Sequence, residues 1–311
     1  MSQTNHPLVS IVTPCYNSAR FLGDCIKSVL AQDYPHVEHI VQDGASADGT
    51  LEILQHYNRC IHWVSERDQG QADALDRALK RCRGDIILVL NADDMLLPHA
   101  ASWAAENMVR FPEAAVIYGD LYVVNAHNEI IGAQFGADPY RFEDILCVDT
   151  VIPAQAAFMR REHLEEVGRG ADATLDTCPD YEMFVRIGLK FPMRHVSGFL
   201  AKYRWHPRPD GRQPRSVKRF VRAKQEVMGR VFHDPKTPPA ILKLRRRAYS
   251  SLALWGAMTA FDEGDWRGCI REVIRSLYLQ PSPSRVGYLL MRLCALPYGT
   301  IFPSASKTDY V

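Results

Sequence analysis

A pair of adjacent carboxylates marks the first candidate site. Asp93 and Asp94 follow an apolar run at residues 86–90, whose length and branched side chains are typical of a strand buried in a parallel sheet. Two carboxylates at the end of such a strand repel each other and are costly to bury, so a bound cation explains them most simply. Oxygen ligands favour Mg²⁺ or Mn²⁺ shared with substrate phosphates. The alternative is a solvated loop that caps a helix near Pro98.

Further polar clusters stand where other predicted strands end. These strands cover residues 8–13, 37–42 and 61–64, and the clusters contain Tyr16, Asp43 and Asp68. Helical patterns separate the strands, so the alternation predicts right-handed crossovers and a doubly wound parallel sheet. Ligands bind at the carboxyl ends of the strands in such sheets. Because all the clusters converge on this edge, we expect the binding site there.

The loop that begins at Asp43 contains mostly small residues. It is neither a dinucleotide-binding fingerprint nor a Walker loop, because the required glycine spacing and the Gly-Lys-Ser/Thr ending are absent. A carboxylate at a strand end can accept a hydrogen bond from an N–H of a base, and small neighbours let a ligand approach the backbone. The alternative is an ordinary strand-to-helix turn with Asp48 as the helix cap.

Four motifs occur in order and at spacings that resemble family 2 of the inverting glycosyltransferases, which have the nucleotide-diphospho-sugar transferase (GT-A) fold. The motifs are Pro14-x-Tyr16-Asn17, Asp43-Gly44-x-Ser46-x-Asp48-Gly49-Thr50, Ser65-Glu66-x-Asp68-x-Gly70-Gln71-x-Asp73-Ala74 and Gly84-Asp85-x5-Asn91-Ala92-Asp93-Asp94. The resemblance covers residues 9–206. It implies a Rossmann-like mixed, mostly parallel sheet and a nucleotide-diphospho-sugar donor as substrate.

The resemblance also implies a nucleotide pocket in the first half of the chain. Asp43 would bind the base, usually uracil, and Tyr16 and the backbone near Pro14 would flank it. Asp68 would lie in the same pocket.

The metal motif of the family, DxD, falls on Asn91, Ala92 and Asp93. Its first Asp, which usually contacts the ribose or the metal shell, is Asn91 here. That departure leaves Asp93 as the expected metal ligand, with Asp94 assisting or contacting the sugar, and it predicts weaker metal binding. The Mn²⁺ or Mg²⁺ ion would bridge the diphosphate and stabilise the charge on the leaving nucleoside diphosphate.

Inversion at the anomeric carbon requires a carboxylate that deprotonates the acceptor hydroxyl. In the family this base opens a helix after the second group of strands, and Asp180 matches that position, where the helix dipole favours the charged form. A simple capping role is the alternative for Asp180, and Glu182 is the alternative base. Gln155 matches a position that commonly faces the acceptor, and we count it among the substrate-binding residues; a buried structural role is the alternative. His206 ends an element similar to the family's Tyr-Arg-x-His and would meet the diphosphate or the metal, unless it is structural.

The second half of the chain is expected to add strands and then helices alone. Strands are predicted at residues 115–118, 121–124, 130–135, 154–159 and 199–205, and helices at residues 217–232, 239–261, 266–279 and 284–296. We therefore expect a GT-A domain over residues 1–213, with a nucleotide-binding half (7–118) and an acceptor half (119–213). An all-helical C-terminal region would follow over residues 214–311.

Composition limits the partners and the compartment. The net charge of the 311 residues is +1, so no bulk field favours nucleic acid. The eight cysteines have no zinc-ligand spacing, which fits a reducing cytoplasm. No apolar run approaches the roughly 20 residues that span a bilayer, and the N-terminus lacks an apolar signal core. Residues 202–224 are rich in Lys and Arg, and one interpretation is a solvated helix face. The other is peripheral contact of this stretch, aided by the apolar C-terminal helices, with an anionic inner membrane face or a polyprenyl-phosphate-linked acceptor.

The sequence thus predicts a metal-dependent inverting glycosyltransferase that moves one sugar from a UDP-sugar to a glycan or a lipid-linked acceptor. Transfer of a single sugar is expected because the QxxRW signature of polymerising relatives is absent. A sugar nucleotidyltransferase is one alternative, although its Gly-rich basic loop after the first strand is missing. A non-catalytic sugar-nucleotide-binding protein is the other, and the Asn91 departure suggests it.

Overall fold

The computed structural model describes residues 6–168, 170–175, 177–205, 217–262 and 264–281. The chain divides into two compact units. Unit 1 comprises Met1–Tyr140 and Ile152–His206, and unit 2 comprises Arg141–Val151 and Pro207–Val311. Unit 1 carries the sheet, and every residue predicted for the site belongs to it.

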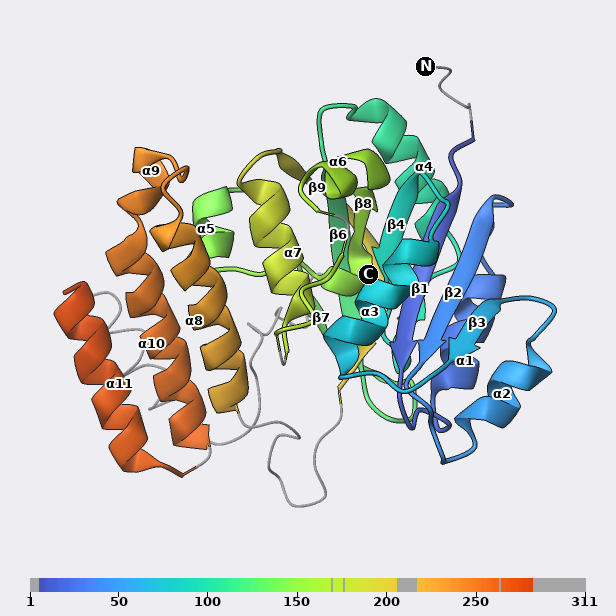
Figure 1. The fold of residues 1–311 in the computed structure, drawn as a ribbon, viewed down its shortest axis with the longest axis horizontal. Helices are drawn as coiled ribbons and strands as arrows, with labels where there is room; N and C mark the ends of the chain where they lie inside the picture. The colour runs from blue at the N-terminus through green and yellow to red at the C-terminus, as the bar shows by residue number, and fades with distance from the viewer. Residues whose placement is uncertain (1–5, 169, 176, 206–216, 263, 282–311) are drawn as a thin grey trace, which may run out of the picture. The chain divides into compact units, whose positions relative to one another are not determined.

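The first half of unit 1 alternates strand and helix as the sequence predicts. Its elements are β1 (Val9–Cys15), α1 (Leu22–Leu30), β2 (Val37–Asp43), α2 (Thr50–His56), β3 (His62–Ser65), α3 (Gln71–Arg81) and β4 (Ile86–Val89). The strands lie side by side in the order β3-β2-β1-β4, and all three pairings are parallel (Figure 1). All seven residues of β1 are buried, as expected for a strand covered on both faces. Consequently the loops after β1, β2, β3 and β4 meet at one edge.

The second half of unit 1 extends the sheet with mixed pairing. Its elements are β5 (Met95–Leu96), α4 (Ala100–Arg110), β6 (Val116–Val124), β7 (Ile130–Gln134), β8 (Ala157–Arg160), α6 (Arg161–Glu166), α7 (Pro179–Gly188) and β9 (Met193–Arg204). β8 runs antiparallel between β4 and β6, and β6 and β9 are parallel. Within the described residues the sheet has nine strands, in the order β3-β2-β1-β4-β8-β6-β9-β5 with β7 on β6. The predicted GT-A fold class is confirmed.

The structure corrects the predicted elements of this half in two places. The two strands expected at residues 115–118 and 121–124 are one strand, β6, whose register against β9 shifts on both sides of Asp120. Gly119 is required there, because a Cβ at this position would lie 2.5 Å from the Gly198 carbonyl oxygen. The strand expected at residues 154–159 begins instead as a 3₁₀ turn, Ala154–Ala156, which takes Gln155 out of the sheet.

Unit 2 is helical in its described part. It contains α5 (Phe142–Leu146), α8 (Val217–His233), α9 (Pro239–Leu242), α10 (Arg245–Asp262) and α11 (Trp266–Leu279). The single helix predicted at residues 239–261 is divided into α9 and α10, and the helix predicted at residues 284–296 lies outside the described residues. α10 packs against both α8 and α11, and the Ser250 hydroxyl bonds the Ser276 carbonyl oxygen at 3.0 Å. None of the described helices is long and apolar enough to cross a membrane.

Candidate active site

The two adjacent carboxylates of the turn after β4, Asp93 and Asp94, differ in burial. Asp93 is half-buried, whereas Asp94 is fully buried. The Asp94 carboxylate accepts hydrogen bonds from the Arg204 backbone N–H (2.8 Å), from the Asn91 amide (3.0 Å) and from the Gln155 side chain. Burial, and secondly the neighbouring charge of Asp93, raise the pKa of Asp94 well above its usual range. Asp94 therefore ties the turn to β9 and to the 3₁₀ turn, and Asp93 is the more accessible carboxylate.

Asn91 has a structural reason to be an amide. Its Nδ2 donates to Asp94 Oδ2 at 3.0 Å, and its Oδ1 accepts from Gln71 Nε2 at 3.2 Å. An aspartate at this position would have no hydrogen to give Asp94, and the two carboxylates would face each other at close range. The departure from the DxD pattern thus links the turn after β4 to the first residue of α3.

The Arg204 guanidinium fixes the backbone of the same turn from inside the protein. Its side chain is fully buried and donates from Nε to the Asp93 carbonyl oxygen (2.9 Å) and from Nη1 to the Asn125 carbonyl oxygen (3.1 Å). Its charge is balanced by the Asp24 carboxylate of α1 at 3.5 Å, and it lies 4.3 Å above the Phe21 ring centroid. Arg204 is the arginine of the Tyr-Arg-x-His element, and the sequence analysis gives it no role of its own. Its position at the end of a strand of alternating residues is the feature that could have indicated its burial.

Tyr203 connects the turn to the predicted base. Burial raises the pKa of the Tyr203 hydroxyl to about 12, and the charges of Asp94, Asp93 and Asp180 act in the same direction. The charges of these three carboxylates therefore act on the same hydroxyl group. Asp180 is exposed in the first turn of α7, which begins at Pro179. The structure thus brings the predicted base and the predicted metal turn together.

The alternative base, Glu182, has a different environment. It is buried, and its carboxylate forms an ion pair with Arg186 one turn later in α7, with an N–O distance of 2.8 Å. Arg186 also donates to the carbonyl oxygens of Val167 (3.0 Å) and Gly170 (2.7 Å). Glu182 therefore anchors the segment before α7, which leaves Asp180 as the exposed carboxylate of the first turn.

The loop after β2 forms the floor of a second polar cluster. Asp43 is fully buried, and its carboxylate accepts from the backbone N–H (3.0 Å) and hydroxyl of Ser46 and from the hydroxyl of Ser65 (2.6 Å). The Cys15 thiol lies 3.7 Å from the same carboxylate. These contacts hold the ends of β1, β2 and β3 together. Pro14, beside them in β1, is also buried.

Tyr16 and Asp68 meet above Gly44. A Cβ added to Gly44 would lie 2.6 Å from Asp68 Oδ2 and 3.2 Å from Tyr16 Cδ2, so both side chains lie against the bare backbone of this glycine. The Tyr16 side chain is 64% exposed, and Asp68 is half-buried. An exposed aromatic ring beside a carboxylate is an arrangement on which a planar base can stack and donate a hydrogen bond.

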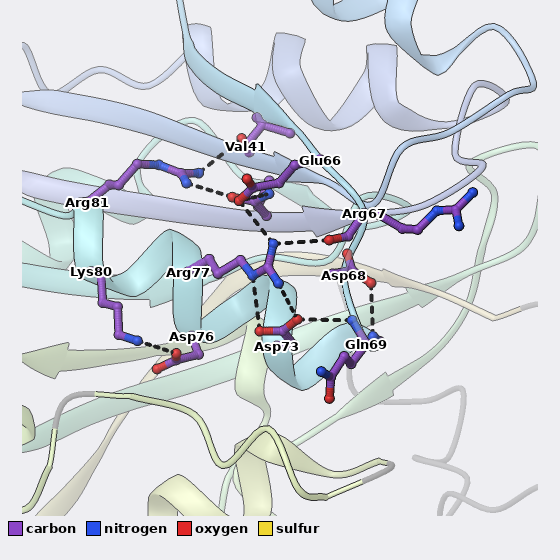
Figure 2. A network of polar contacts seen from close by, with 12 residues as sticks. Val41, Glu66, Arg67, Asp68, Gln69, Asp73, Asp76, Arg77, Lys80 and Arg81 are labelled. Carbon is purple, nitrogen blue, oxygen red and sulfur yellow. Dashed lines mark hydrogen bonds and ion pairs between the residues drawn. The ribbon is translucent and has the colours of Figure 1, made fainter.

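An ion-pair network on α3 holds the loop that carries Asp68 (Figure 2). Arg77 pairs with Asp73 at 2.8 Å and with Glu66 at 3.1 Å. Asp73 in turn accepts from the Gln69 backbone N–H at 3.0 Å. Glu66 and Asp73 belong to one of the family motifs in the sequence. In the structure they position the loop through Arg77 of α3 and the Gln69 backbone.

The metal prediction fits the donor chemistry of Asp93. No group of three or more His, Cys, Asp or Glu side chains in the described ranges could hold a metal ion. Carboxylate oxygen is nevertheless the donor that Mg²⁺ and Mn²⁺ use when substrate phosphates and water supply the remaining ligands. His206, predicted as a further ligand, lies outside the described residues.

Comparison with known proteins identifies a family model and two curated relatives that match this chain. The family description Glycosyl transferase family 2 matches residues 10–168. The chondroitin synthase of Escherichia coli is 26% identical over 194 residues, which are 61% of this chain and 28% of that protein. The putative teichuronic acid biosynthesis glycosyltransferase TuaG of Bacillus subtilis is 44% identical over 92 residues, which are 28% of this chain and 36% of that protein. The matched part of this chain therefore spans only a minor share of each of these two relatives.

Solved structures show the same fold at low sequence identity. TarS 1–349 of S. aureus superposes with a TM-score of 0.61 at 16% identity, over 91% of this chain and 83% of that chain. The mannosyltransferase PcManGT of Pyrobaculum calidifontis, solved with GDP-Man and Mn²⁺, superposes with a TM-score of 0.60 at 17% identity, over 94% and 81%. On its sequence match and its GT-A fold, the chain belongs to glycosyl transferase family 2.

Proposed function

We propose that this protein is a metal-dependent inverting glycosyltransferase that moves one sugar from a UDP-sugar to a glycan or a polyprenyl-phosphate-linked acceptor. The observation that carries the proposal is the arrangement of the two acidic segments: the turn of Asp93 and Asp94 is hydrogen-bonded to the end of β9, Asp180 is exposed at the start of α7, and the charges of all three act on Tyr203 of β9. A metal-binding turn and a base must lie near each other, because the attacked carbon is bonded to the diphosphate that the metal would hold.

The nucleotide base lies on the cluster formed by Tyr16, Gly44 and Asp68. The base stacks on the exposed Tyr16 ring, and Asp68 accepts a hydrogen bond from its N–H. Asp43 acts on the base through the loop that its carboxylate holds, because the donors from Ser46, Ser65 and Cys15 already occupy its oxygens. TarS has been solved with UDP and with UDP-GlcNAc, which supports a uridine donor within this fold.

Asp93 would hold the divalent ion, with the diphosphate of the donor as a further ligand. The ion supplies a positive charge that offsets the charge developing on the leaving nucleoside diphosphate. Asn91, Asp94 and Arg204 keep the Asp93 backbone in place through the contacts described above. His206 is proposed as an additional ligand on the basis of its motif.

Asp180 is the general base. Its carboxylate takes the proton of the acceptor hydroxyl while the hydroxyl oxygen bonds to the anomeric carbon. The bond from that carbon to the diphosphate oxygen breaks on the opposite face, and the configuration is inverted. The Gln155 side chain donates to Asp94 and so supports the metal turn from the side of β8.

The names of two relatives bear on the acceptor, and the cysteine pattern bears on the compartment. The two relatives compared above are named for chondroitin and teichuronic acid synthesis, which favours a polysaccharide or its lipid-linked precursor as the acceptor. The scattered cysteines of the sequence favour the cytoplasm, where the protein would work at the inner membrane face.

Isothermal titration with UDP in the presence of Mn²⁺ tests the donor site. We expect Asp68→Asn and Asp93→Asn each to weaken binding by at least about tenfold, because each removes a charge-assisted contact. Asp180→Asn should bind UDP normally and yet lose transfer by about a hundredfold or more. Glu106→Gln, at an exposed position of α4, is the matched control. Unchanged binding in both Asp68→Asn and Asp93→Asn, or transfer independent of Asp180, would contradict the proposal.

A further inference from the structure

One face of α11 exposes an apolar stripe that the proposed transferase reaction does not use. Trp266, Ile270, Ile274 and Tyr278 follow one another at intervals of four residues, which places them on one side of the helix. They are 59%, 59%, 62% and 81% exposed. The buried residues Cys269 and Ser276 lie on the other side, where α11 packs against α10. Single exposed apolar residues are common on protein surfaces, but four large ones in one row form a continuous patch. Such a patch indicates an interaction surface.

A row of arginines runs beside the stripe. Arg267, Arg271 and Arg275 each follow a stripe residue by one position, and all three are exposed. Arg271 and Arg275 share one counter-ion, Glu272, at 3.4 Å and 3.5 Å. The Glu272 side chain is only 18% exposed, so the outward charge of this face is positive.

We propose that this face of α11 (the stripe and the arginine row) lies on an anionic lipid bilayer. An amphipathic helix with tryptophan and aliphatic residues on one side and arginines beside them binds in the plane of a membrane interface. Trp266 and Tyr278, at the two ends of the stripe, are the residue types that favour the headgroup level. The arginines supply the charge complementarity to anionic headgroups.

A second copy of the chain fits this face less well. In an antiparallel two-fold contact of α11 with its copy, the arginine rows of both copies would lie on the same side of the stripe and come close together. Like charges at a desolvated contact oppose association, whereas an anionic bilayer neutralises them.

The sequence predicted a bilayer contact for the basic stretch together with the C-terminal helices, and α11 is one of these helices. Much of the basic stretch, residues 202–224, lies outside the described residues. Within α8, Lys224 is buried and its ammonium lies 5.5 Å from the Trp255 ring centroid, so this lysine packs within unit 2. The membrane face rests on the proposed function in one point: a transferase with a lipid-linked acceptor has to reach that acceptor at a bilayer.

Sedimentation of the full chain with lipid vesicles tests the proposal. The wild type should bind vesicles that contain phosphatidylglycerol, bind pure phosphatidylcholine vesicles far less, and lose binding as salt is raised. Ile270→Ser/Ile274→Ser and, separately, Arg267→Gln/Arg271→Gln/Arg275→Gln should each lower the partition coefficient by at least about tenfold.

Matched controls alter equally exposed residues of unit 1. Ile130→Ser/Ile131→Ser removes two exposed isoleucines of β7, and Lys27→Gln/Arg59→Gln/Arg110→Gln removes three exposed cationic side chains. These variants should bind vesicles as the wild type does. The proposal is overturned if the wild type does not bind anionic vesicles or if the α11 variants bind them as well as the wild type. It is also overturned if the control variants lose as much vesicle binding as the α11 variants, or if Ile270→Ser/Ile274→Ser converts a dimer to a monomer in size-exclusion chromatography.

UDP binding of the same variants separates the two proposals. The α11 variants should retain wild-type affinity for UDP and Mn²⁺, which also shows that they are folded. Loss of vesicle binding with UDP binding intact supports the membrane face alone. Vesicle binding by a wild type that fails to bind UDP would count against the transferase proposal and leave the membrane face standing.

Discussion

At the residue scale, the hydrogen bond between Asn91 and Asp94 joins an amide donor to a buried carboxylate. In Asn91→Asp this bond becomes a contact between two carboxylates, and we expect the free energy of unfolding to fall by about 2 kcal/mol. Chemical denaturation at neutral pH measures the change. The exchanged pair, Asn91→Asp/Asp94→Asn, restores one donor and one acceptor and should recover most of the loss. Equal losses in the single and the exchanged variant would show that the bond does not hold the turn.

Arg204 permits a second prediction at this scale. Lysine keeps the charge but cannot reach the carbonyl oxygens of Asp93 and Asn125 together, because it has no planar fork. Arg204→Lys should therefore raise the Mn²⁺ concentration needed for half-maximal transfer by about fivefold or more, while KM for the acceptor stays unchanged. Lys27→Gln, at an exposed position of α1, is the control. A purely structural role would instead lower the amount of folded protein and leave the Mn²⁺ dependence of the remainder unaltered.

At the scale of elements, the bulge of β6 explains one failure of sequence reasoning. Gly119 and Asp120 looked like the end of a strand, yet the chain continues, and the shift in register takes up the irregularity. Gly119→Ala should destabilise the protein by about 2 kcal/mol or more, because its Cβ would meet the Gly198 carbonyl oxygen at 2.5 Å. Gly132→Ala in β7 is the control, since its Cβ would approach only Val123, at 3.9 Å. Thermal unfolding should separate the two variants, and equal melting temperatures would contradict the assignment.

His39 in β2 predicts how the sheet responds to acid. Burial lowers the pKa of His39 to about 3, and its Nε2 bonds the Thr13 hydroxyl at 2.9 Å. Between about pH 3 and 6.5 this histidine binds a proton in the unfolded chain, where its pKa is near 6.5, but not in the folded chain. The free energy of unfolding therefore contains the full contribution of neutral His39 above about pH 6.5 and loses it as the pH falls toward 3.

Replacement of His39 isolates this effect. In His39→Gln the free energy of unfolding should depend less on pH between about 3 and 6.5, by up to about 1.4 kcal/mol per pH unit. Denaturant titrations across that range provide the measurement. His62→Gln, at an exposed position of β3, should keep the wild-type slope. A His39→Gln slope identical to that of the wild type would rule out the buried neutral histidine.

At the scale of the whole molecule, the parallel half of the sheet was predictable and the contacts of its edge were not. Each strand from β1 to β4 is marked by a short apolar run and each helix between them by an apolar period, and both are local properties of the sequence. The short strand β5 and the helix α5 have too few residues to show such a period. The burial of Arg204 and of Asp94 depends on β9 meeting the turn after β4, about a hundred residues earlier in the chain, and no local pattern reveals that contact.

The same distinction applies to the site. The residue types of Asp93, Asp180, Tyr16 and Asp68 indicated ligand chemistry. In the structure the charges of Asp93 and Asp180 act on the same hydroxyl group, and Tyr16 and Asp68 lie beside Gly44. The motif residues Asp43, Glu66, Asp73 and Glu182 also have the side chains expected of ligands, but their carboxylates are engaged in hydrogen bonds and ion pairs with other protein groups. A carboxylate that binds a ligand and one that holds a loop have the same letter in the sequence, and only their partners tell them apart.

A crystal structure of the protein with UDP and Mn²⁺ would show, through the anomalous scattering of the metal, whether Asp93 is a metal ligand. We expect one strong anomalous peak at about 2.0–2.3 Å from an Asp93 carboxylate oxygen. The diphosphate should complete the coordination, with the base on Tyr16 and Asp180 on the open side of the metal. A metal peak away from Asp93, or a diphosphate on a different surface from Asp180, would contradict the proposed function.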